Sequence, residues 1–382
     1  MKCTLNEPFL SNLEKQYVLD VLESNWLSAN GKHTKIFEKK FADYVGVKHC
    51  VAVQSGTAAL HLALKAFGVG KGDRVIIPNY SCGATISSVL QCGAIPVVLD
   101  VEIDTYGLDS TNLEKAIKKY SPKALQIVHM YGYPARDFMA ICDLCKKYGV
   151  FLIEDASESL GASLNNKMAG QFGDGATFSI RSEKMIGVGE GGVVVTNNSG
   201  YFEKVLLLAS RSAPFRTHSS PYWAKYFYDG EGYNYLLPHL LGAVARAQIE
   251  RFEKEIFPEK QRVGLLYREL FAGLEGVTMQ KVIPKARSAY WLNSLLFKKL
   301  KKEEVHELGN LLLSQGVEIR SGFWPLNDMS AFTPEIFGHQ EVGNYLMNHL
   351  LVLPSAYCLG KEDITAIKRI IINFLKKKQL KK

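Results

Sequence analysis

The chain has 382 residues, of which 47% are hydrophobic and 22% charged, a composition typical of globular proteins. Its formal net charge is +8, but the C-terminal run from Lys376 to Lys382 alone contains five lysines, so we predict no nucleic-acid-binding role. Its apolar runs are too short to span a bilayer, and its first residues lack the apolar core of a signal peptide. We therefore expect no membrane partner and a cytoplasmic location.

The length exceeds the size at which one hydrophobic core stops growing, so we expect two domains. The first ~45 residues show the helical spacing of apolar side chains. From about residue 50, short apolar runs alternate with helical stretches. We predict strands at 50–53, 74–77, 96–99, 124–128, 151–153, 176–179 and 192–195, with helices at 57–67, 84–92 and 135–148. Buried strands separated by helices specify a mainly parallel sheet, so residues 1–250 should form a large α/β domain with an N-terminal helical segment.

The alternation weakens after about residue 200. Residues 212–230 are loop-like and rich in aromatic side chains, and a long helical stretch at 240–274 is interrupted near Pro258. Beyond it we predict strands at 294–297 and 317–319 and helices at 303–315 and 361–377. Residues 251–382 are therefore expected to form a smaller α+β domain.

The seven cysteines are odd in number and scattered, which is typical of reduced thiols. Cys142 and Cys145 lie one helical turn apart, but no second pair accompanies them. We therefore predict no metal site.

Three motifs carry candidate chemistry. Ser55-Gly56-Thr57 follows a predicted strand and opens a helix, an arrangement that either binds a phosphate or simply caps the helix. Glu154-Asp155 ends a buried strand, where carboxylates either bind ligands or cap the next element. Lys184 follows the next strand and precedes a loop containing four glycines. A lysine paired with a carboxylate is what pyridoxal phosphate (PLP) chemistry needs, because the amine binds the aldehyde and the carboxylate keeps the pyridine nitrogen protonated.

These motifs resemble those of the DegT/DnrJ/EryC1/StrS family, PLP-dependent sugar aminotransferases of fold type I. The resemblance extends over nearly the whole chain. It includes Trp26-Leu-Ser, Ser55-Gly-Thr-Ala-Ala-Leu, Gly70-x-Gly-Asp73, Gly93-Ala-x-Pro-Val97, His129-x-Tyr-Gly132, Ile153-Glu-Asp-Ala156, Phe178-Ser179, Lys184, Gly189-Glu-Gly-Gly192, Gly232-Tyr-Asn234 and Trp324-Pro-Leu326.

The resemblance implies a role for each matching residue. Lys184 would hold PLP covalently and then move the proton between substrate and cofactor, with pyridoxamine 5′-phosphate as the intermediate form. Asp155 would pair with the pyridinium nitrogen. Gly56, Thr57 and Ser179 would hold the phosphate. Asn234 would reach the same phosphate from the partner subunit, which makes a homodimer part of the site.

Two positions expected near the cofactor depart from the family pattern. Cys82 stands where members usually stack an aromatic ring on the cofactor, so either stacking is lost, which we expect, or Tyr80 supplies it. Glu158 stands where many members have Gln or His near the PLP 3′-oxygen, and it would need a proton or an intervening donor there.

Recognition of the sugar is the least determined part of the sequence. Asn327 occupies a position where His is frequent in the family. Arg320, Trp324 and Tyr80 are candidates for substrate binding, and further aromatic residues that could line the pocket are Tyr222, Trp223, Tyr290, Trp291 and Phe323.

The resemblance implies transfer of the amino group of L-glutamate to the 3-keto or 4-keto group of a nucleotide-linked hexose, for amino-sugar and surface-polysaccharide synthesis, including lipopolysaccharide O-antigen. Three alternatives stay open. One is transamination of a small ketone without a nucleotide, and another is a non-catalytic regulator that binds PLP or a nucleotide sugar. The third is a sugar 3-dehydratase, against which Lys184 argues, because such members carry His at this position.

Overall fold

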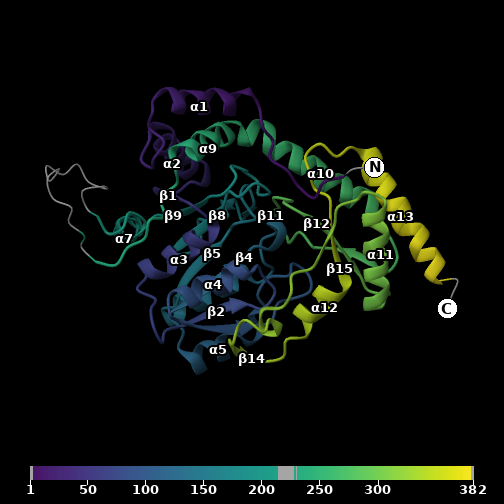
Figure 1. The fold of residues 1–382 in the computed structure, drawn as a ribbon. Helices are drawn as coiled ribbons and strands as arrows, with labels where there is room; N and C mark the ends of the chain where they lie inside the picture. The colour runs from purple at the N-terminus through teal and green to yellow at the C-terminus, as the bar shows by residue number, and fades with distance from the viewer. Residues whose placement is uncertain (1–2, 214–227, 229, 380–382) are drawn as a thin grey trace.

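The computed structural model describes residues 3–213, 228 and 230–379. Its centre is an eight-stranded sheet with strand order β1-β9-β8-β5-β4-β2-β3-β14 (Figure 1). The strands are β1 (His49–Val53), β2 (Arg74–Pro78), β3 (Ile95–Leu99), β4 (Ala124–Val128), β5 (Phe151–Asp155), β8 (Gly175–Ser179), β9 (Gly192–Thr196) and β14 (Glu335–Phe337). Strand β9 pairs antiparallel with both β1 and β8, and the other neighbours are parallel. All seven strands predicted before residue 200 are confirmed within two residues of their bounds.

Helices cover both faces of this sheet. One face packs against α3 (Gly56–Ala66), α4 (Gly83–Gln91) and α7 (Ser199–Ala209). The other face packs against α2 (Lys32–Val45), α5 (Leu113–Tyr120), α6 (Phe138–Tyr148) and α9 (His239–Arg251). Coverage on both sides explains why the strands are continuously apolar instead of alternating.

Helix α1 (Asn12–Glu23) lies against α9, and α9 continues through a π-helical turn at Phe252–Ile256 into α10 (Phe257–Phe271). The predicted interruption of the long helix is therefore confirmed, but it precedes Pro258. The proline lies in the first turn of α10, where its missing N–H costs no hydrogen bond.

A second sheet, in the order β10-β12-β15-β13, forms the core of the C-terminal part together with its helices. Its strands are β10 (Val277–Met279), β12 (Asn293–Phe297), β15 (Leu350–Leu353) and β13 (Arg320–Ser321), and the helices are α11 (Lys302–Ser314), α12 (Glu341–His349) and α13 (Lys361–Gln379). A small third sheet joins β11 (Ala286–Arg287), β6 (Ser163–Leu164) and β7 (Lys167–Met168). The strand predicted at 317–319 is wrong: Val317 makes only an isolated bridge to Cys3, and the strand begins at Arg320.

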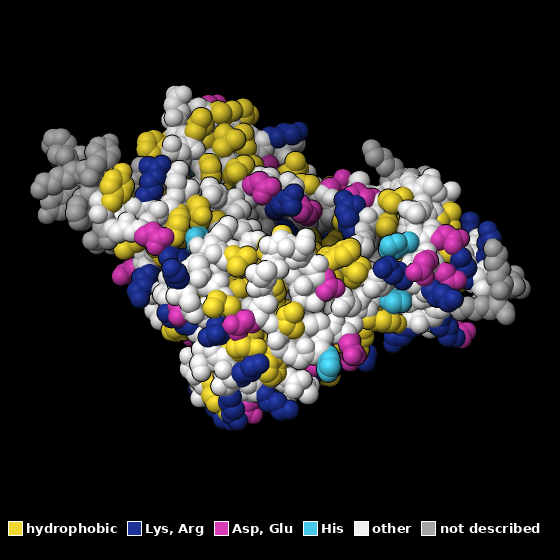
Figure 2. Space-filling view, turned by 60° about the horizontal axis from the view of Figure 1, so that its bottom comes forward, with side chains coloured by type: hydrophobic (Ala, Val, Ile, Leu, Met, Phe, Trp, Pro, Cys, Tyr) yellow, Lys and Arg dark blue, Asp and Glu magenta, His cyan; other side chains and the backbone are white. Residues whose placement is uncertain are grey.

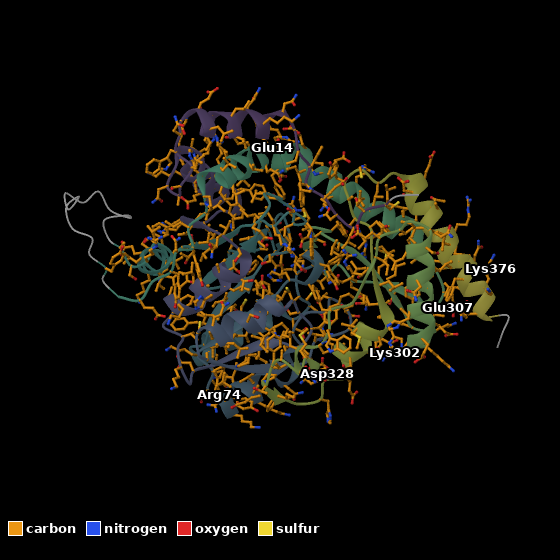
Figure 3. All side chains as sticks on the ribbon, viewed as in Figure 1. Glu14, Arg74, Lys302, Glu307, Asp328 and Lys376 are labelled. Atoms are coloured by element: carbon orange, nitrogen blue, oxygen red, sulfur yellow. The ribbon has the colours of Figure 1, made fainter. Side chains whose placement is uncertain are left out.

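Strand β14 returns from the C-terminal part to the edge of the large sheet, where it pairs with β3. Arg74, labelled in Figure 3, donates from Nε and Nη2 to the two carboxylate oxygens of Glu335, both at 3.1 Å. The division at residue 250 stays a prediction. Among the described residues, no helix is both long and apolar enough to cross a membrane.

Candidate active site

A cavity of about 230 Å³ lies at the carboxyl ends of β4, β5 and β8, which is where ligands bind in open parallel sheets. The amino ends of α3 and α4 close it from the side. It brings together seven of the residues singled out in the sequence, namely Gly56, Thr57, Cys82, Asp155, Glu158, Ser179 and Lys184.

One wall is the start of α3. Ser55 caps this helix by accepting a hydrogen bond from the N–H of Ala58 at 3.1 Å, while Gly56 and Thr57 occupy the first turn, whose N–H groups have no partner within a helix. A Cβ on Gly56 would lie 3.0 Å from the Cβ of Ser179, so the glycine lets this helix start approach the end of β8. Amide groups beside a hydroxyl form a cradle suited to a phosphate.

Of the two carboxylates that end β5, Asp155 lines the cavity and Glu154 does not. Oδ1 of Asp155 accepts the N–H of Ser157 at 3.2 Å. Burial raises the pKa of Asp155, while the hydrogen bonds from Ser157 and the nearby Lys184 and His129 act in the opposite direction. A cation placed beside this carboxylate would favour its charged form.

Lys184 lies in a turn between β8 and β9, closed by its own N–H, which donates to the carbonyl of Arg181 at 2.8 Å. Its amine enters the cavity, donates to Oε1 of Glu158 at 3.1 Å and lies 3.5 Å from the ring centroid of Trp291. Its side chain is only 12% exposed, so the amine is enclosed instead of lying in solvent. The sequence analysis named Trp291 only as a residue that could line the pocket. It could not predict the contact with the Lys184 amine, because Trp291 lies in a distant segment just before β12 and no residue near Lys184 in the sequence indicates this contact.

Glu158 is buried beside this amine. Its Oε2 accepts the N–H of Tyr131 at 2.7 Å. Burial raises its pKa, against the opposing effects of Lys184 and the Tyr131 N–H. With donors on both of its oxygens, this carboxylate would need a proton before it could lie next to an anionic oxygen.

Cys82 is the N-cap of α4 and is exposed at the cavity. None of the cavity-lining residues in the described part of the chain is aromatic. Tyr80 is fully buried, its hydroxyl lies 3.0 Å from that of Tyr131, and it is not among the lining residues. This arrangement gives no support to stacking by Tyr80, and its use in substrate binding stays a prediction.

Several predicted residues lie outside this cavity. Arg320 is exposed and pairs with Glu318 at 2.6 Å, and Trp324 is 54% exposed. Asn234 is exposed in a bridge with Ser210. Tyr222 and Trp223 lie outside the described residues. The sequence interpretation missed the charged rim formed by Arg181, Glu183 and Glu190, whose only signal was their position on either side of Lys184.

The cavity suits a phosphorylated pyridine aldehyde. The start of α3, which Gly56 lets approach Ser179 closely, would receive the phosphate, and the buried Asp155 would face the ring nitrogen. The enclosed amine of Lys184 would provide the nucleophile for the aldehyde.

Comparison with known proteins agrees with this geometry. The family model described as the DegT/DnrJ/EryC1/StrS aminotransferase family matches residues 8–371. The chain is similar to GDP-perosamine synthase of Vibrio cholerae, with 35% identity over 85% of this chain and 86% of that one. It is also similar to GDP-perosamine synthase of Escherichia coli O157:H7, with 32% identity over 96% and 97% of the two chains.

A crystal structure of a DegT/DnrJ/EryC1/StrS aminotransferase from Brucella abortus superposes with a TM-score of 0.86 at 26% identity, covering 95% of each chain. Fold, cavity and sequence thus agree over nearly the whole length. The chain belongs to the DegT/DnrJ/EryC1/StrS family of PLP-dependent aminotransferases.

Proposed function

We propose that the protein transfers the amino group of L-glutamate to a ketone on a hexose linked to a nucleoside diphosphate. The observation that carries this proposal is the enclosed amine of Lys184, which shares one cavity with Asp155 and with the glycine-opened start of α3. The relatives named as GDP-perosamine synthases make a GDP-linked keto-sugar the first substrate to test.

Each residue has a task in this reaction. PLP supplies the electron sink that stabilises negative charge at the substrate carbon. Gly56, Thr57 and Ser179 would hold the phosphate, and Asp155 would keep the pyridine nitrogen protonated. The Lys184 amine would accept a proton from the α-carbon of glutamate, and in the second half-reaction it would give a proton to the sugar carbon.

Glu158 keeps the Lys184 amine within reach of the reacting carbon, since the two side chains are in contact at 3.1 Å. The cavity wall formed by Val128, Met130 and Leu60 is apolar and limits the access of water. Exclusion of water favours amine transfer over hydrolysis.

The protein is further proposed to act as a homodimer in which Asn234 completes the phosphate site of the partner. Asn234 is exposed and does not line the cavity of its own chain. Large apolar side chains are exposed on and beside α1, and Figure 2 shows hydrophobic side chains gathered at the top of the molecule, where α1 lies. The exposed apolar side chains on and beside α1 are Leu10, Leu19, Leu22, Trp26 and Leu27. Clusters of this kind are typical of surfaces that bind another protein.

Borohydride reduction followed by peptide mapping tests the proposal, because it fixes the cofactor on the lysine that carries it. We expect a yellow protein with the label on Lys184, loss of both in Lys184→Ala, and retention of both in Lys361→Ala, which replaces an exposed lysine. Amino transfer from glutamate to a panel of nucleotide-linked keto-sugars and small ketones then identifies the acceptor. A label on any other lysine, or transfer only to ketones that lack a nucleotide, would contradict the proposal.

A further inference from the structure

The residue before Lys184 is held from a distant part of the chain. The carbonyl oxygen of Glu183 belongs to the peptide bond that joins Glu183 to Lys184, and it accepts two side-chain hydrogen bonds, from Nδ2 of Asn6 and from Nε1 of Trp291, both at 2.5 Å. The orientation of that peptide bond determines where the Lys184 side chain starts. Trp291 also contacts the amine itself, so both ends of the Lys184 residue are held.

Asn6 is fixed in turn by a buried lysine. Lys260, on α10, is 2% exposed, and its amine donates to Oδ1 of Asn6 at 2.5 Å and to the carbonyl of Ser355 at 2.6 Å. Burial lowers the pKa of Lys260 to about 7, against the opposing influence of Cys358 and Glu7. A lysine is rarely enclosed so completely without a specific partner.

The rest of the N-terminal segment, residues 3–9, is anchored on both sides of Asn6. On one side, the carbonyl of Leu5 accepts the N–H of Ser355 at 2.7 Å. On the other, the carbonyl of Phe9 accepts from Nη1 of Arg251 at 3.1 Å, and the same Nη1 pairs with Glu14 at 2.6 Å. Glu14 is labelled in Figure 3, where it lies between α1 and the long α9–α10 helix. The segment therefore reaches the Lys184 turn from a fixed direction.

We propose that Asn6 is a positioning residue for Lys184, acting through the Glu183 carbonyl, and that Lys260 holds the Asn6 amide in the orientation this requires. This rests on the proposed function of Lys184. Asn6 and Lys260 do not line the cavity, so their effect on the reaction reaches it only through the turn. Their removal should slow the steps in which the Lys184 amine moves a proton and leave binding of glutamate nearly unchanged.

The Asn6→Asp variant separates orientation of the turn from anchoring of the segment. Its carboxylate keeps the acceptor for Lys260 but has no N–H to donate to Glu183. Because a misplacement near 1 Å can cost up to a hundredfold in rate, we expect kcat for the glutamate half-reaction to fall roughly tenfold while KM changes less than about twofold. Amide hydrogen exchange at residues 183–187 of the holoenzyme should become faster, a readout that does not depend on turnover.

Ser11→Ala is the matched control, since it removes the cap of α1 without touching the Glu183 carbonyl. It should leave kcat and exchange at 183–187 unchanged. Lys260→Met is the second variant and should change both quantities in the same direction as Asn6→Asp, because it frees the Asn6 amide to rotate.

The inference is overturned if Asn6→Asp and Lys260→Met both match Ser11→Ala in kcat and in exchange at 183–187. Borohydride mapping of each variant keeps this outcome apart from a failure of the proposed function. Label on Lys184 with unchanged rates removes the positioning role alone, whereas absence of label from Lys184 in the unmodified protein removes the proposed function.

Discussion

Glu154 and Asp155 follow one another at the end of β5, and their side chains leave the strand toward opposite faces. Glu154 accepts the N–H groups of Gly170, Phe172 and Gly173 at 2.6–2.8 Å, so it holds a loop in place. Asp155 lines the cavity beside Lys184. The sequence predicts a carboxylate at this strand end, and the alternation of a strand predicts that only one of the two can face a ligand. Which one faces it depends on which side of the sheet carries the cavity.

Because the Lys260 side chain is buried, its contribution to the free energy of unfolding should depend on pH. Its folded-state pKa is lowered to about 7 from 10.5, so between these values the unfolded chain binds a proton that the folded chain does not. The free energy of unfolding contributed by Lys260 therefore rises with pH across this range, by up to about 1.4 kcal/mol per pH unit.

Denaturant unfolding of the wild type and of Lys260→Met at pH 7.5 and 9.5 measures this slope, because the other titrating groups cancel in the difference. We expect the wild type to gain stability relative to Lys260→Met by about 2 kcal/mol between these two conditions. Lys361→Met, which replaces an exposed lysine, controls for the loss of one charge. A difference that stays constant with pH would show that Lys260 is protonated in the folded protein.

At the scale of elements, the site depends on how closely α3 and β9 approach each other. A Cβ on Gly192, the first residue of β9, would lie 2.3 Å from the carbonyl oxygen of Ser55 and 2.8 Å from the nitrogen of Gly56. The sequence analysis noted four glycines after Lys184. Gly189 has a φ of +105°, a conformation that favours glycine, whereas Gly192 is needed because a neighbouring backbone leaves no room for a side chain.

Gly192→Ala should therefore displace the start of α3 and weaken the phosphate site. We expect a loss of about 1–3 kcal/mol in the free energy of unfolding and at least a tenfold weaker binding of PLP to the apoprotein. Gly70→Ala is the control, because a Cβ at that position meets nothing within 4 Å. Equal PLP affinities of the two variants, measured by fluorescence titration, would contradict this account of Gly192.

At the scale of the whole molecule, one chain supplies the cavity but leaves Asn234 exposed outside it. If Asn234 completes the site of the partner, Lys184→Ala and Asn234→Ala homodimers should each lose activity. A mixed dimer then contains one cavity with both defects and one cavity with neither. Mixing the two variants under conditions that exchange subunits should produce mixed dimers. Each mixed dimer should have about half of the activity of a wild-type dimer, because closed two-fold symmetry gives it one intact cavity out of two.

The recovered activity should scale with the fraction of mixed dimers, measured by native mass spectrometry of differently tagged chains. Lys184→Ala mixed with a second Lys184 variant should recover nothing and serves as the control. If the Asn234→Ala homodimer is fully active, or if mixing restores nothing although mixed dimers form, Asn234 does not act across the interface.

The sequence by itself indicated the succession of strands along residues 50–196 and the acidic end of β5, and it singled out Lys184 as the candidate cofactor lysine. These features follow from local periodicity and from motifs whose residues lie near one another in the chain. It could not determine the contact of Trp291 with Lys184, the hydrogen bond of Asn6 to Glu183, or the return of β14 to the large sheet. Only the tertiary structure decided these, because each joins segments more than 100 residues apart, and no local pattern encodes which distant surfaces pack together.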